Sequence, residues 1–142
     1  MESLDLSKKA PRSPWVKIGG AYMLARTIDK LRAQLPGGNI GPYRIAPGFS
    51  ERLLQIIGCS EEEMREVVAR AKNEDEVVTW ATARMDKEKL ERYNERASKR
   101  CIADVDDLED FAKRYPIVKD MPHDTALFDM LDKDDASIYA RT

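Results

Sequence analysis

The chain has 142 residues, of which 35% are charged and 42% hydrophobic, and its net charge is −2. This length predicts a single domain over residues 1–142 whose core needs neither disulfides nor a metal. The two cysteines match no metal or redox spacing and are expected to be free thiols in a reducing compartment. The chain start lacks signal-peptide features, and no stretch approaches the ~18 apolar residues of a membrane helix. The sequence therefore predicts a cytoplasmic protein that makes no contact with a membrane.

Charge is distributed unevenly along the chain. Residues 1–58 carry nine basic and four acidic side chains, whereas residues 103–142 carry five basic and eleven acidic ones. Opposite charges at the two ends can attract each other within one fold, attract a neighbouring subunit, or face different partners. Because the pI is near 5.6, the basic N-terminal part is not expected to bind nucleic acid.

The first 18 residues are predicted to form an extended arm. Pro11 and Pro14 fix their own φ angles and push the preceding residues toward extended conformations. Trp15 and two nearby aliphatic side chains provide apolar anchors, so we expect the arm to pack against the core. The pair Gly19-Gly20 then separates the arm from the first helix.

A first helix is predicted over about residues 21–35. Its apolar residues recur at i, i+4, i+7 and i+11 and so share one face: Leu24, Ile28, Leu31 and Leu35. The charged residues Arg26, Asp29 and Lys30 are predicted to lie on the other faces. A Pro-Gly-Gly sequence ends the helix, and a Gly/Pro-rich loop follows over residues 37–48.

Six further helices are predicted in the rest of the chain. A capping box starts one of them at Ser60, and Asn73 repeats this device thirteen residues later. Asp86 and Asp104 are predicted to cap the next two. The predicted ranges are 49–57, 61–71, 74–84, 87–101, 105–114 and 124–131. With no strand signal, the sequence predicts an all-α fold of six or seven short helices, an extended arm and one Gly/Pro-rich loop.

Three blocks of the sequence are distinctive when they are taken together. They are P-R-S-P…K-I-G-G with R-T-I-D-K-L-R-A, then S-E-E-E with N-E-D-E-V-V-T-W, and finally L-F-D-M-L-D-K-D-D-A-S. The chain resembles, over nearly its whole length, a bacterial family of small proteins known only as a domain of unknown function. This resemblance implies one compact domain, and it carries over no activity, cofactor or substrate.

The acidic residues near the C-terminus are predicted to need a cationic partner. Asp132, Asp134 and Asp135 follow the helix predicted over 124–131, where the negative end of the helix dipole makes each carboxylate cost about 0.3–1 kcal/mol. The opposite charges stand in the first block of the chain: Arg12, Arg26, Lys30 and Arg32. We expect the two ends to meet in one polar network, as a structural lock or as a site for a small anion or a divalent metal. A solvated acidic turn is the alternative.

The residues also suggest two other kinds of binding site. The aspartates around residue 132 offer the oxygen ligands that Mg²⁺ and Ca²⁺ prefer, but they lack the glycine and distal glutamate of a calcium loop, so no metal is predicted. Arg12-Ser13, ahead of two glycines and a helix start, could grip a phosphate or carboxylate. The alternative there is a tight turn with a salt bridge.

No recognisable catalytic motif is present. His123 is the only histidine, and neither cysteine nor any serine motif stands near it in the sequence. Cys59 lies beside the start of a helix, which could lower its thiol pKa, but a buried inert thiol is the favoured interpretation. Whether the protein is an enzyme is left open.

The sequence thus favours a binding or interaction module with no cofactor. Its expected partner is another protein or a second copy of the chain, and a small anionic ligand is a further option. The alternative is a small-molecule enzyme or an anion-binding protein that uses charged groups between the first helix and the C-terminal aspartates. The candidate residues are Arg12, Ser13, Arg26, Asp29, Lys30, Arg32, Asp132, Asp134 and Asp135.

Overall fold

Helices make up all the regular structure in residues 1–140, the part of the chain that this computed structural model describes. The α-helices are α1 (Leu24–Ala33), α2 (Phe49–Ile57), α3 (Glu61–Arg70), α4 (Glu74–Arg84), α5 (Lys87–Lys99), α6 (Leu108–Arg114) and α7 (Leu127–Tyr139). Two 3-10 helices, η1 (Ile102–Asp104) and η2 (Pro116–Asp120), flank α6. The predicted all-α fold of short helices is confirmed, and no described helix is long and apolar enough to cross a membrane.

Side-chain caps set most of the helix starts. At α3 the Ser60 hydroxyl accepts from the Glu63 N–H while the Glu63 carboxylate accepts from the Ser60 N–H, which confirms the capping box. Asn73 and Asp86 cap α4 and α5 as predicted, with side-chain oxygens that accept from the N–H groups of Glu76 and Lys89. The capping box predicted at Asn73 is incomplete, because the Glu76 carboxylate accepts from the Lys72 N–H instead of the Asn73 N–H. The prediction for α6 was wrong, because this helix starts at Leu108 and is capped by Asp107.

Asp104 takes a different role from the predicted helix cap. Its carboxylate accepts a hydrogen bond of 2.9 Å from the backbone N–H of Cys101 and so closes the short helix η1. Two acidic residues in the next three positions offer equivalent caps, and the chain uses the later one, Asp107, for α6. A cap motif therefore located the helix only to within about three residues.

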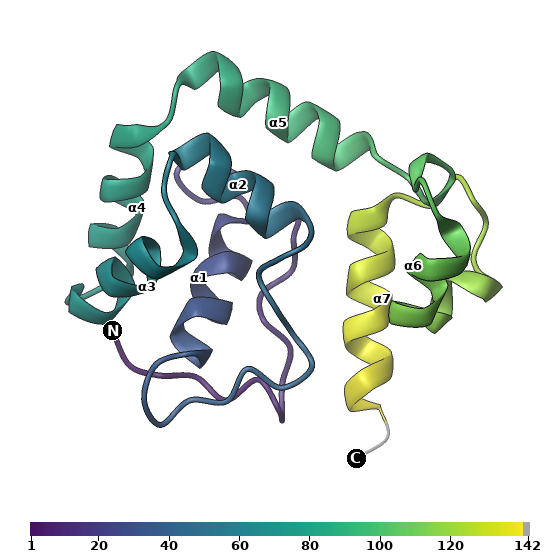
Figure 1. Cartoon of the computed structure of the whole chain (residues 1–142), viewed down its shortest axis with the longest axis horizontal. Helices are drawn as coiled ribbons and strands as arrows, with labels where there is room; N and C mark the ends of the chain where they lie inside the picture. Colours follow the sequence, from purple (N-terminus) through teal and green to yellow (C-terminus); the bar gives the residue numbers. More distant parts are fainter. Residues whose placement is uncertain (141–142) are drawn as a thin grey trace.

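Helix α1 is the central element of the fold (Figure 1). It starts at Leu24 rather than at residue 21, because Met23 adopts a left-handed conformation with φ 69°. The predicted apolar stripe is buried, and Arg26, Asp29 and Lys30 lie on the other faces of α1, but these faces are buried as well. All three are buried because other parts of the chain cover α1 on all sides except at Arg32, with α3 and α2 packed directly on it.

The N-terminal arm runs along α1 and ends in an aromatic cluster. Its backbone pairs with the residues after α1, with Leu6 N–H donating to the Asn39 carbonyl at 2.7 Å. At its far end the Trp15 ring stands edge-on to Phe128 of α7, with ring centroids 5.0 Å apart. The arm thus contacts elements from both ends of the chain.

Helix α7 is longer than the sequence indicates. It was predicted to end at residue 131, but it continues to Tyr139, so the three aspartates lie within the helix. The argument from the negative end of the helix dipole therefore does not apply to them. The apolar stripe breaks at Asp135, which is only 6% exposed and occupies a position that faces the interior.

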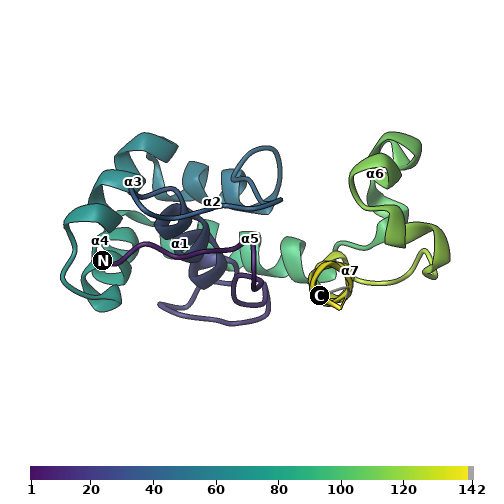
Figure 2. The same cartoon turned by 90° about the horizontal axis from the view of Figure 1, so that it is seen from below.

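The buried apolar residues form two clusters that share α7. The larger surrounds α1 and includes Phe128, whereas the smaller lies between α6, η2 and α7 and includes Leu127 and Leu131. Figure 2 shows α6 and α7 at one end of the molecule, joined by α5 to the end that holds α1–α4. Because α7 contributes to both clusters, it fixes the position of one relative to the other.

Candidate functional site

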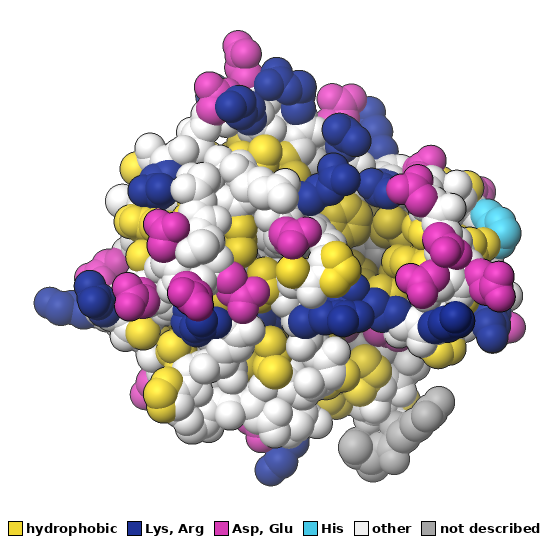
Figure 3. Space-filling view, viewed as in Figure 1, with side chains coloured by type: hydrophobic (Ala, Val, Ile, Leu, Met, Phe, Trp, Pro, Cys, Tyr) yellow, Lys and Arg dark blue, Asp and Glu magenta, His cyan; other side chains and the backbone are white. Residues whose placement is uncertain are grey.

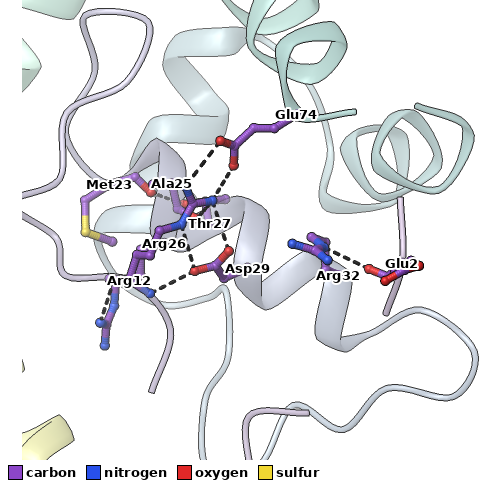
Figure 4. Close-up of polar contacts among 9 residues, drawn as sticks. All are labelled: Glu2, Arg12, Met23, Ala25, Arg26, Thr27, Asp29, Arg32 and Glu74. Carbon is purple, nitrogen blue, oxygen red and sulfur yellow. Dashed lines mark hydrogen bonds and ion pairs between the residues drawn. The ribbon is translucent and has the colours of Figure 1, made fainter. Parts of the chain in front are cut away.

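The polar residues of α1 divide into two networks, and the first centres on Arg12. Its guanidinium donates to both carboxylate oxygens of Asp29, at 3.0 and 3.1 Å, and to both oxygens of Glu74 at the start of α4 (Figure 4). Asp29 also accepts from the Arg12 backbone N–H at 2.8 Å. The hydrogen bonds to Glu74 and Asp29 raise the pKa of Arg12. Since two carboxylates already hold this guanidinium, the network fastens the arm to α1 and α4.

The second network starts at Arg26, whose side chain is 2% exposed. Its two terminal nitrogens donate to the two oxygens of Asp135 at 2.7 and 3.1 Å, which is a bidentate ion pair between α1 and α7. The Tyr43 hydroxyl donates to the same carboxylate at 2.8 Å. The Arg26 Nε atom is buried and has no hydrogen-bond partner among the described residues.

Lys30 lies one helical turn further along α1 and is 8% exposed. The only hydrogen bond of its Nζ atom within residues 1–140 is to the Ser50 hydroxyl, at 3.4 Å. The Ser50 oxygen in turn lies 2.9 Å from the hydroxyl oxygen of Thr27. Burial, together with the smaller effects of the positive charges of Arg26 and Arg114, lowers the pKa of Lys30 to about 7, while the Asp135 carboxylate acts in the opposite direction.

Arg114, at the end of α6, completes this group of cations. Its guanidinium donates to the Pro47 carbonyl at 3.3 Å and lies over the ring of Tyr115, 5.1 Å from its centroid. Burial lowers its pKa, and the nearby Asp134 carboxylate acts in the opposite direction. Burial, followed by the charge of Asp135, raises the pKa of Asp134. We call the group Arg26, Lys30, Arg114, Asp134 and Asp135 the cationic centre.

Comparison with protein families places this centre in a known sequence context. A family model described as a domain of unknown function, DUF5069, matches residues 8–137. The chain belongs to this family. The matched range includes every residue of the cationic centre and of the Arg12 network. No curated protein matches the chain.

The remaining predicted site residues lie outside the centre. The Ser13 hydroxyl accepts from the backbone N–H of Trp15 at 3.2 Å within the arm. Arg32 donates to the Glu2 carbonyl at 2.8 Å on the exposed side of α1 (Figure 4). Asp132 is half-buried on α7 and forms no ion pair with any residue of the described part. The expected meeting of the two ends of the chain is therefore present at Arg26 and Asp135.

Two sequence-based alternatives can be reassessed from the geometry. The C-terminal aspartates do not gather: Asp129 accepts from the Trp15 ring N–H at 2.8 Å, and no group of three potential metal ligands occurs within residues 1–140. At Cys59 burial and then the charge of Glu63 raise the thiol pKa, which agrees with the favoured interpretation of an inert thiol and not with the lowered pKa. Both cysteines are free thiols, as predicted.

Sequence reasoning missed three residues that belong to this site. Tyr43, Ser50 and Arg114 come from the Gly/Pro-rich loop, α2 and α6, and each contacts or electrostatically influences a charged residue of α1. None lies within a motif. Of the three, only Tyr43 could have been suspected from the sequence. It is a large aromatic residue in a loop of glycines and prolines, where local structure does not require one.

Proposed function

We propose that this DUF5069 protein binds a small anion, carrying a carboxylate or a phosphate group, at the cationic centre. The observation that carries the proposal is Lys30, a buried amine that forms no ion pair within residues 1–140 and whose hydrogen bond to Ser50 is long. A buried cation without a counter-charge is unfavourable. An incoming anion supplies that counter-charge and gains a strong interaction for the same reason.

The two arginines provide further donors for such an anion. The two terminal nitrogens of Arg26 donate to Asp135, and its Nε has no hydrogen-bond partner within residues 1–140. One nitrogen of Arg114 donates to the Pro47 carbonyl. Guanidinium groups hold carboxylates and phosphates through paired N–H donors. Because Asp135 already occupies one side of Arg26, the anion would sit on the side of Lys30 and Arg114.

Access to the centre is controlled by the loop between α1 and α2. Tyr43 donates to Asp135, and the Pro47 carbonyl accepts from Arg114, so the loop bridges α7 and α6 across the centre. Arg44 and Pro47 themselves are exposed. A small displacement of the segment from Tyr43 to Pro47 would open the centre to solvent, and a ligand would then replace these contacts.

A small-molecule enzyme is the second candidate function, and the state of Lys30 favours it. With its pKa near 7, Lys30 is a neutral amine in about half of the molecules at neutral pH, and a neutral amine can accept a proton or attack a carbonyl carbon. Attack on a 2-oxo acid would form an imine and release water. This reading predicts that cyanoborohydride reduces the imine formed with pyruvate to a stable adduct on Lys30.

The proposal is tested by ligand-dependent thermal stability of the full chain. Inorganic phosphate, citrate and ATP serve as probes, each against sodium chloride of equal ionic strength. A probe at one hundred times its Kd adds about 2.7 kcal/mol to the free energy of unfolding. We expect a rise in Tm for the native chain that is lost in Lys30→Met and kept in Lys133→Met, which removes an exposed lysine of α7.

The outcomes separate binding from catalysis. Equal responses of the native chain and Lys30→Met would contradict the assignment of the site. A response accompanied by a cyanoborohydride-stable pyruvate adduct, found by mass spectrometry and absent from Lys30→Met, would favour the enzyme. Stabilisation by citrate or phosphate without an adduct would favour a binding protein.

A further inference from the structure

A groove between α2 and α5 lies apart from the cationic centre. It has a volume of about 640 Å³, and its lining combines basic side chains with an apolar floor that includes Phe49, Ile56, Tyr93 and Ala97. Figure 3 shows a hollow on this face of the molecule, with hydrophobic side chains inside it and Lys and Arg side chains along its edge. A concave surface of this composition is suited to an acidic partner with apolar residues.

The basic edge of the groove is formed mainly by α5. Lys89, Arg92 and Arg96 recur at i, i+3 and i+7 and so share one face of the helix, opposite Arg52 of α2. All four are exposed, and none forms an ion pair with another residue of the described chain. Asp104 is the single carboxylate among the described lining residues. The groove therefore presents a field of unpaired positive charge.

An exposed segment of opposite charge lies beside this groove. Residues 104–110 contain five carboxylates, and all five side chains belong to exposed residues: Asp104, Asp106, Asp107, Glu109 and Asp110. Between them stand two half-buried apolar residues, Val105 and Leu108. In Figure 3, Asp and Glu side chains gather over the end of the molecule that carries α6, on the face that also shows the hollow.

We propose that the α2–α5 groove binds the acidic segment 104–110 of a second copy of this chain. Asp104 belongs to both surfaces, so groove and segment are neighbours on one face. A two-fold axis between them places each segment against the other copy's groove, forming two equivalent contacts and a closed dimer. The carboxylates of each segment would meet Arg92 and Arg96 of the other copy, while Val105 and Leu108 stay packed on the cluster between α6, η2 and α7 and hold the segment in place.

Nucleic acid fits the same groove less well. Binding of single strands relies on aromatic faces that are free to stack on bases. Here the Tyr93 residue is 8% exposed, with its hydroxyl donating to the Phe49 carbonyl, and the Phe49 ring stands edge-on to Phe128 with centroids 5.1 Å apart. The acidic segment beside the groove also repels phosphates, whereas it is the element that a second copy needs.

Self-association is measured by sedimentation equilibrium of the full chain between 5 and 500 µM, concentrations chosen to span about µM affinity. The groove variant combines Arg92→Glu with Arg96→Glu, and the segment variant combines Asp106→Lys with Glu109→Lys, which leaves the α6 cap at Asp107 intact. Lys8→Glu with Lys9→Glu is the control, because it changes the net charge as the groove variant does, at exposed positions of the arm. Circular dichroism establishes that each variant is folded.

We expect a dimer at low salt whose Kd rises at least about tenfold in each of the two test variants, and also on increasing the salt concentration. The control should dimerise as the native chain does. An equimolar mixture of groove and segment variants should associate, because one contact then pairs two native surfaces and the other pairs two reversed ones.

Three results would overturn the proposal. The native chain could remain monomeric at 500 µM and low salt, or it could form a dimer whose Kd is the same in the groove variant. A monomer that instead binds fluorescein-labelled oligothymidine through Arg92 and Arg96 would assign the groove to nucleic acid. If a variant fails to fold, the concentration and salt dependence of the native chain still decides the matter.

Discussion

The substitution Lys30→Met tests the electrostatic argument for the cationic centre most directly. Methionine retains the length of the lysine stem and removes the ammonium group. Burial lowers the pKa of Lys30 from an ordinary value near 10.5 to about 7. At about 1.4 kcal/mol for each pKa unit, holding Lys30 in its charged form destabilises the fold by up to about 5 kcal/mol. We therefore expect the variant without ligand to be more stable than the native chain at pH 7.

The stability difference between Lys30→Met and the native chain should depend on pH. Between pH 7 and 10.5 the unfolded chain holds a proton on Lys30 that the folded chain has released, so the native stability rises with pH in this window. The penalty is complete below pH 7 and disappears above about pH 10.5. Lys30→Met lacks this contribution. Its advantage over the native chain should therefore shrink by about 2 kcal/mol between pH 7 and pH 9.

The assay is urea unfolding followed by circular dichroism at several pH values from 6 to 9, in a chloride buffer free of phosphate and carboxylates. Groups that titrate nearby, such as Cys59, are present in both chains and cancel in the difference. The exposed substitution Lys133→Met is the matched control for the loss of a lysine side chain. A stability difference for Lys30→Met that is equal at pH 7 and pH 9 would refute the reasoning.

Three further changes should act through single identified contacts, each measured by urea unfolding at pH 7. Asp135→Asn should lower the free energy of unfolding by about 3–5 kcal/mol, because it leaves the Arg26 charge buried without its partner. Ser60→Ala removes the capping box of α3 and should cost about 0.5–2 kcal/mol. Gly38→Ala should cost about 1–3 kcal/mol, since its new methyl group would lie 2.5 Å from the Ala33 carbonyl oxygen. A loss below 1 kcal/mol for Asp135→Asn would contradict the importance of the α1–α7 ion pair.

Local chemistry made the middle of the fold predictable from the sequence. The start of α3 follows from Ser60 and Glu63, which lie three residues apart and satisfy each other's backbone N–H groups without help from the rest of the chain. Asn73 and Asp86 cap the next two helices through residues equally close in sequence, each accepting from the N–H three positions later. These helices could be placed because their ends depend on neighbours in sequence.

The burial and pairing of the interior charged residues could not be predicted in this way, because their partners are distant in sequence. Arg26 pairs with Asp135, 109 residues away, and α7 continues past residue 131 because that pair lets a carboxylate occupy an inward position. A periodicity argument treats each charged residue as a mark of the solvent side. That argument ended α7 too early and gave no sign that Lys30 would be buried.

The choice of charged rather than apolar residues at these inward positions is itself informative. A buried ion pair is often no more stabilising than a well-packed apolar pair of similar size, so stability alone does not account for Arg26 and Asp135. Lys30 is harder still to explain by stability, because it weakens the fold when it is charged and forms no ion pair within residues 1–140. Both observations are explained if the interior of α1 is built to hold an anion, since the same uncompensated charge that destabilises the empty site then contributes to binding.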